Sequence, residues 1–124
     1  MYVTDTEETS TSKVTVKNAM QYIDQHIMDD VCLETVSKHV DVSASHLIRL
    51  FKKHTEHTYL GYVTRRKMEK AAELFAKENL KVYEVSNMLG YCSERYFSKL
   101  FLKRFGCYPS KYYQTLNEQT QHEK

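Results

Sequence analysis

One stretch of the sequence, residues 82–109, constrains the fold more than any other. Apolar residues recur there at helical spacing until Gly90 interrupts the pattern, and a second helical run follows Ser93, a good N-cap residue. Gly106 and then Pro109 end the second run. Two helices joined by so short a turn form a helix-turn-helix. The apolar positions are Val82, Val85, Met88, Leu89, Phe97, Leu100 and Phe101.

The outer face of the second run is basic, because Arg95, Lys99, Lys103 and Arg104 lie away from its apolar positions. Lysine and arginine gathered along one helix are typical of a surface that binds the phosphates of nucleic acid. A solvated helical surface is the alternative interpretation if charge alone is considered.

The same pattern occurs earlier in the chain. Shifting the sequence by 49 residues aligns residues 33–42 with residues 82–91, and Val36 then matches Val85. After a gap of one residue in the turn, an offset of 50 aligns residues 47–53 with residues 97–103. The chain therefore contains two copies of one helix-turn-helix unit.

Composition indicates an all-α fold. The 124 residues include only 3 Gly and 1 Pro, and no segment alternates apolar and polar residues as a strand does. This length suits one small domain or two very small lobes. Charge is unevenly distributed: residues 43–111 hold 14 Lys or Arg and 6 Asp or Glu, whereas residues 1–42 hold 3 and 8. Basic charge is thus concentrated where both motifs lie.

Other classes of protein are not favoured. Three widely spaced cysteines without a C-x-x-C pair indicate reduced thiols, and no apolar run approaches the roughly 20 residues of a membrane span, so we expect a cytoplasmic protein. The six histidines lack the spacing of a metal site, and there is no glycine-rich phosphate loop. We therefore expect neither an enzyme nor a cofactor or metal.

The motifs resemble a known family. LIRLFKKHT followed by YVTRRKMEKAAELF and then VYEVSNMLGYCSERYFSKLFLKRFGCYPSKYY is similar to the DNA-binding domain of the AraC/XylS family of bacterial transcription regulators, over roughly residues 16–113. The sequence departs from the family pattern where Glu56 replaces Gly, Lys67 replaces Arg, and Tyr108 replaces Thr.

The resemblance implies an all-α fold with two helix-turn-helix subdomains, joined by a long linker helix, and about seven helices in total. We expect a flexible tail or linker at residues 1–14, the first subdomain at 15–57 and the linker helix at 58–78. The second subdomain is expected at 79–116 and a frayed tail at 117–124. A linker helix of 20 residues is about 30 Å long. That length suits two recognition helices in successive major-groove segments, about 34 Å apart, of an asymmetric site.

The resemblance also assigns the residues that contact bases. Arg49 is the strongest candidate, because its guanidinium can donate two hydrogen bonds to guanine, although a surface arginine paired with a carboxylate is the alternative. Ile48 offers only apolar contact, and Tyr96 either packs or enters the groove. Glu94 either compensates the helix dipole or accepts from cytosine. The expected base-contacting set is Ser45, Ile48, Arg49, Arg95, Tyr96 and Lys99.

Phosphate contacts give affinity without base preference. We assign them to residues near both ends of the two recognition helices, although His46 is alternatively a residue that only stabilises the start of its helix. The expected phosphate-contacting set is Ser43, His46, Lys52, Lys53, Ser93, Lys103 and Arg104.

The resemblance thus implies a sequence-specific regulator that binds double-stranded DNA, usually an activator, with RNA polymerase as a further partner. A helical protein-interaction module, whose basic face docks an acidic partner, is the alternative function. Family members commonly carry an additional effector-binding or receiver domain. The chain is therefore either a stand-alone regulator or the C-terminal part of a longer protein, and the acidic, Ser- and Thr-rich residues 1–13 favour the latter.

Overall fold

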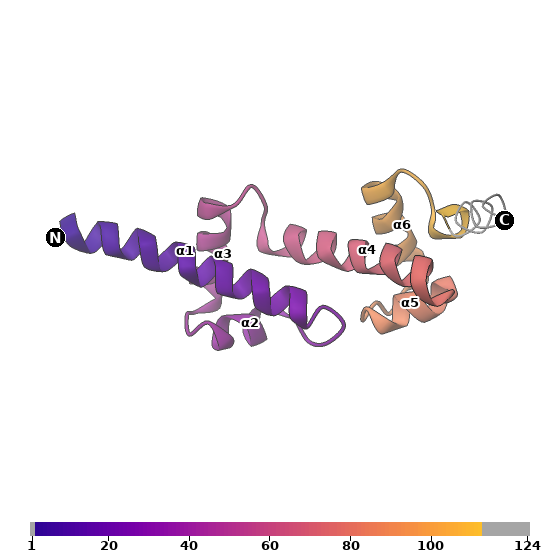
Figure 1. Cartoon of the computed structure of the whole chain (residues 1–124), viewed down its shortest axis with the longest axis horizontal. Helices are drawn as coiled ribbons and strands as arrows, with labels where there is room; N and C mark the ends of the chain where they lie inside the picture. Colours follow the sequence, from indigo (N-terminus) through magenta and orange to yellow (C-terminus); the bar gives the residue numbers. More distant parts are fainter. Residues whose placement is uncertain (1, 113–124) are drawn as a thin grey trace. The chain divides into compact units, whose positions relative to one another are not determined.

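The computed structural model describes residues 2–112, and side chains from residue 11 onwards (Figure 1). All regular structure in these residues is helical, which confirms the all-α prediction. Residues 109–112 are also helical, and the tail expected at 117–124 lies outside the described residues. The labelled elements are α1 (Tyr2–Gln25), α2 (Leu33–His39), α3 (Ala44–His54), α4 (Tyr59–Glu78), α5 (Val82–Met88) and α6 (Glu94–Phe105).

The chain divides into two units, Met1–Val63 and Thr64–Lys124. The first unit holds α1, α2 and α3, and the second holds α5 and α6. Helix α4 is continuous and contributes to both, because its first turn, up to Val63, belongs to the first unit. We expected residues 58–78 to form a linker helix separate from the two subdomains. Instead, the first turn of α4 belongs to the first unit and the rest of the helix to the second.

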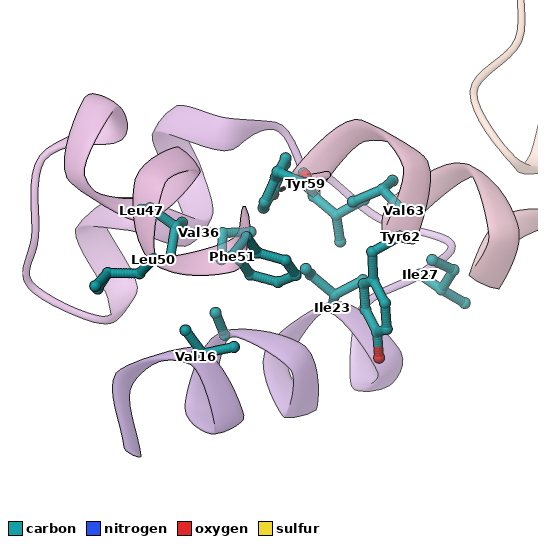
Figure 2. Close-up of a cluster of buried hydrophobic side chains, with 12 residues drawn as sticks. Val16, Ile23, Ile27, Val36, Leu47, Leu50, Phe51, Tyr59, Tyr62 and Val63 are labelled. Atoms are coloured by element: carbon teal, nitrogen blue, oxygen red, sulfur yellow. Dashed lines mark hydrogen bonds between the residues drawn. The ribbon is translucent and has the colours of Figure 1, made fainter. Parts of the chain in front are cut away.

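The core of the first unit forms around Phe51, which is fully buried (Figure 2). The expected face of α1 is buried, and it packs with the apolar faces of α2 and α3. The rings of Tyr59 and Tyr62 lie 5.3 and 5.7 Å from the Phe51 ring. Their hydroxyls donate hydrogen bonds, from Tyr59 to the carbonyl of Val31 at 2.7 Å and from Tyr62 to Asp24 at 3.0 Å. Buried residues from α1, α2 and α3 are Val16, Ala19, Ile23, Val36, Leu47, Leu50 and Phe51.

The second unit has an aromatic core. Phe101 of α6 is fully buried, and its ring lies 5.8 Å from Phe75 of α4, 5.4 Å from Tyr112 and 4.6 Å from Phe105. Tyr112 thus closes this unit, as expected. The other buried residues are Met68, Ala71, Leu74, Phe75, Val85, Ser86, Leu89, Phe97 and Pro109.

The two turns have the same backbone geometry, as the internal repeat predicts. Asp41 and Gly90, which are 49 residues apart, both have positive φ angles, of 60° and 84°. In each turn the next residue donates a backbone hydrogen bond of 3.0 Å to a serine carbonyl, from Val42 to Ser37 and from Tyr91 to Ser86. The helix-turn-helix is therefore formed twice.

Two expectations about the helices differ from the structure. Residues 2–14, expected as a tail without regular structure, are helical and continue α1 towards the N-terminus. Among residues 11–16, whose side chains the structure describes, Val14 is 54% exposed and Val16 is the first that is buried. Whether the segment links to a further domain stays a prediction.

Apolar residues recur at helical spacing in residues 58–77, from Leu60 to Phe75, which predicts Leu60 on the buried stripe of the linker helix; this prediction is wrong. The Leu60 side chain is 73% exposed, because Tyr59, Tyr62 and Val63 occupy the face of α4 that turns towards the first core. The other apolar residues of the expected stripe, from Val63 to Phe75, are buried.

Candidate nucleic-acid interface

Helix α3 is built to present one polar face. Its N-cap, Ser43, accepts a hydrogen bond of 3.1 Å from the backbone N–H of His46, which satisfies one of the free donors at the helix start. The buried residues Leu47, Leu50 and Phe51 hold the opposite face in the core.

The structure brings the expected base-contacting residues of α3 together. Ser45, Ile48 and Arg49 are exposed, and their spacing of three and four residues places them along one side of the helix. Ile48 is 48% exposed although it is large and apolar. This strip is one that a partner surface can cover.

Arg49 is not paired with a carboxylate in the part of the chain that the structure describes. Its guanidinium instead contacts the ring of His46, with 2.8 Å between Nη2 and Nδ1. Because the arginine still has donors that this contact does not use, it remains available to a base edge.

Helix α6 repeats the arrangement of α3. Its N-cap, Ser93, accepts a hydrogen bond of 3.1 Å from the backbone N–H of Tyr96, and Gly106 ends the helix with a φ of 78°. Arg95, Tyr96 and Lys99 are exposed, as expected for residues that contact bases.

An open depression of about 580 Å³ lies beside the start of α6. Arg95 and Lys99 line it together with Glu94, Ser98 and Tyr108. Tyr108, which is 50% exposed, was noted in the sequence only as a departure from the family pattern and not as a site residue. In the sequence, Tyr108 directly precedes Pro109, where a further helix starts. This is the clue from which its place beside α6 could have been predicted.

Tyr96 both packs and remains exposed. Its ring lies 6.1 Å from the ring of Tyr91, yet 55% of its surface is accessible. Burial raises the pKa of Tyr91 to about 12, and the Nζ of Lys67 lies 5.2 Å from the centre of its ring. These contacts hold the turn of the second motif against α4.

The expected phosphate-contacting residues have different surroundings. Lys52 and Lys53, in the last turn of α3, and Lys103, in the last turn of α6, are exposed. Arg104 instead approaches Glu69 of α4 at 3.5 Å and lies 5.0 Å from the ring of Phe105. Its charge is therefore partly neutralised within the second unit.

Glu69 also forms an ion pair of 2.8 Å with Arg66. It is thus the acidic centre of a small cluster that includes Arg66 of α4 and Arg104 of α6. In the sequence, Arg66 is one of several basic residues at the start of this helix. Nothing in the sequence pattern links Glu69 to Arg104 of α6.

The described residues also bear on other classes of protein. They contain no group of three or more His, Cys, Asp or Glu placed to hold a metal ion. None of their helices combines the length and the apolar character needed to cross a membrane.

Comparison with known proteins identifies similar chains. A family model described as a helix-turn-helix domain matches residues 36–115. The regulatory protein PocR of Salmonella typhimurium is 34% identical over 83% of this chain and 34% of its own length. The chain spans about a third or less of the length of several curated relatives that it matches, PocR among them.

Solved structures have the same fold. The C-terminal domain of AraT, a response regulator from Geobacillus stearothermophilus, is 35% identical, with a TM-score of 0.74 over 82% of this chain and 84% of that domain. An AraC-type transcriptional regulator from Chromobacterium violaceum has a TM-score of 0.77 over 86% of this chain and 96% of its own, at 19% identity.

Proposed function

Because this chain belongs to the AraC/XylS family of DNA-binding transcription regulators, we propose that it recognises a specific double-stranded DNA sequence through α3 and α6 and activates transcription. The observation that carries this proposal is the repeated recognition helix. In each unit a serine N-cap starts a helix that buries one face and exposes a polar strip, with Arg49 or Lys99 at the equivalent position.

We propose that the two helices enter successive major-groove segments. Continuous helix α4, with 20 residues, is about 30 Å long, close to the roughly 34 Å between such segments. The two strips differ, since Ser45, Ile48 and Arg49 of α3 correspond to Arg95, Ser98 and Lys99 of α6. Two different strips require an asymmetric site.

The chemistry of each strip suggests its preference. Arg49, Arg95 and Lys99 suit guanine, whose O6 and N7 accept hydrogen bonds in the major groove. Ile48 suits the methyl group of thymine, and the hydroxyl of Ser45 can pair with several bases. Phosphate contacts are assigned to the remaining residues at the helix ends, namely Ser43, His46, Lys52, Lys53, Ser93, Lys103 and Arg104.

The wider setting is part of the proposal. An activator acts on RNA polymerase, which we propose as a partner, and we place the protein in the cytoplasm. Since the relative PocR is about three times as long, we also propose that the domain functions with an effector-binding or receiver domain in a longer chain. Membership of this family does not favour the alternative function, a helical protein-interaction module.

A selection from random duplexes of about 25 base pairs tests the function, with the affinity of the selected sites followed across salt. We expect one asymmetric site with two blocks about one helical turn apart. A flat sequence profile with steep salt dependence would reduce the role of this domain to phosphate binding. Absence of binding at low salt would support the protein-interaction module instead.

A further inference from the structure

We propose that His46 is a positioning residue that orients the guanidinium of Arg49 for guanine and joins this base contact to the DNA backbone. The motivating observation is the contact of 2.8 Å between Arg49 Nη2 and His46 Nδ1 on the exposed side of α3. The inference rests on the proposed function, since it concerns how one of its residues selects a base.

The chemistry of the pair determines which atom donates. Arginine has only donors, so the hydrogen bond requires a lone pair on Nδ1 of His46. The ring is then neutral and carries its proton on Nε2. One nitrogen of His46 therefore holds Arg49, and the other keeps an N–H that can donate to a phosphate oxygen.

The position of His46 on α3 suits both contacts. Its backbone N–H is held by Ser43 at 3.1 Å, so the residue lies in the first turn, where helix N–H groups and the dipole favour a phosphate. Residues three apart share a helix face, which brings the His46 ring to Arg49. His46 is half-buried whereas Arg49 is exposed, so the less mobile ring restrains the more mobile side chain.

Restraint matters because a free arginine side chain loses rotamer entropy when it is fixed in one geometry. Holding the guanidinium before binding reduces that loss for the one orientation that fits guanine. His46 should therefore increase the preference for guanine more than it increases affinity for DNA in general.

The second unit lacks this device. Tyr96 and Lys99 are equivalent to His46 and Arg49, but the Tyr96 ring packs near Tyr91, at 6.1 Å. No hydrogen bond joins Lys99 to Tyr96 in the described structure. The block of the DNA site bound by α6 therefore serves as an internal reference for effects of changes at His46.

The test uses two substitutions that each retain one half of the imidazole. Asparagine places its oxygen near the position of Nδ1, and glutamine places its amide nitrogen near Nε2. His46→Asn should keep the preference for guanine over adenine in the α3 block and weaken binding to all sequences alike, because the neutral N–H that donates to phosphate is lost; the salt slope should not change, since no charge is removed. His46→Gln should lose several-fold in that preference and keep the general affinity for DNA. His46→Ala should lose both, with the α6 block unchanged.

Measurements of the chain without DNA separate this inference from the proposed function. The ¹⁵N shifts of the His46 ring should show the proton on Nε2, and Arg49→Ala should shift Nδ1. The same substitutions at His39, an exposed histidine of α2, are the control and should leave binding unchanged. Thermal unfolding checks that every variant is folded.

Distinct results would overturn each idea. Equal losses on guanine and adenine sites for His46→Gln, or ring shifts indifferent to Arg49→Ala, would show that His46 does not position Arg49. If the unaltered chain itself shows no preference among DNA sequences while the ring shifts respond to Arg49→Ala, the proposed function fails and the pairing of the two residues stands.

Discussion

Lys103 and Arg104 are neighbours on α6 with the same charge, yet they have different surroundings. Lys103 is exposed in the last turn of the helix, whereas the guanidinium of Arg104 lies 3.5 Å from the carboxylate of Glu69. A charge that already has an acidic neighbour releases fewer DNA counterions when it binds, because it must first leave that neighbour. The two residues should therefore contribute unequally to DNA binding.

We expect Lys103→Ala to weaken binding to all sequences alike and to lower the salt slope by about 1. Arg104→Ala should change the slope less, while it lowers stability by up to about 1 kcal/mol, as expected for a partly exposed ion pair. Titrations of cognate and random duplexes at several salt concentrations measure the slopes. Equal slopes for the two variants would show that Arg104 leaves Glu69 on DNA.

At the scale of helices, the starts of α3 and α6 combine two functions in one residue. Ser93 accepts a hydrogen bond from the backbone N–H of Tyr96, while its hydroxyl proton is free to be donated to a phosphate. Stability and DNA binding therefore depend on the same side chain, and they can be separated by residues that cap equally well but differ in charge.

Ser93→Ala should lower the free energy of unfolding by about 1 kcal/mol, because the N-cap is lost. Ser93→Asp should keep the stability, since aspartate caps as well as serine, but it should weaken DNA binding through repulsion of the phosphates. Denaturant unfolding and duplex titration give the two quantities. Binding unaffected by Ser93→Asp would remove Ser93 from the phosphate contacts.

The turn before α6 provides a second prediction at this scale. Gly90 has a φ of 84°, and a Cβ there would meet only the Nζ of Lys67 at 3.9 Å, which is ordinary contact. The cost of a side chain is thus one of backbone conformation, about 1–2 kcal/mol for most residues. Gly90→Asp should cost less than Gly90→Val, because Asp41 adopts φ 60° at the equivalent turn. If Gly90→Asp lowers the free energy of unfolding more than Gly90→Val does, the two turns are not equivalent in backbone conformation.

At the scale of the whole chain, two separate cores support the two recognition helices. Phe101 is central to the second core and Leu47 is fully buried in the first. Removing a large core side chain typically costs about 3–5 kcal/mol for phenylalanine and about 2–5 kcal/mol for leucine. Because each unit has its own core, each loss should remain local.

We expect Phe101→Ala to abolish protection of the α6 block of the DNA site while weak protection of the α3 block remains. Leu47→Ala is the matched variant and should give the opposite result. Footprinting on the selected duplex, with thermal unfolding of both variants, makes the measurement. Simultaneous loss of both blocks in either variant would show that the two units fold and bind as one.

Features that depend on local spacing could be predicted from the amino-acid sequence. Helical periodicity, the serine N-caps and the turn residues at Asp41 and Gly90 act over a few positions, so the repeated helix-turn-helix and its exposed strips were predicted correctly. The roles of those strips on DNA remain predictions.

The contacts between distant side chains are known only from the folded structure. It pairs Glu69 with Arg104, places Tyr108 beside α6 and leaves Leu60 exposed while Tyr62 is buried. Periodicity states which residues share a face of a helix, but it does not state which face of another helix they contact. That choice depends on how side chains from several helices fill one core, which is a property of the packed chain and not of any single segment.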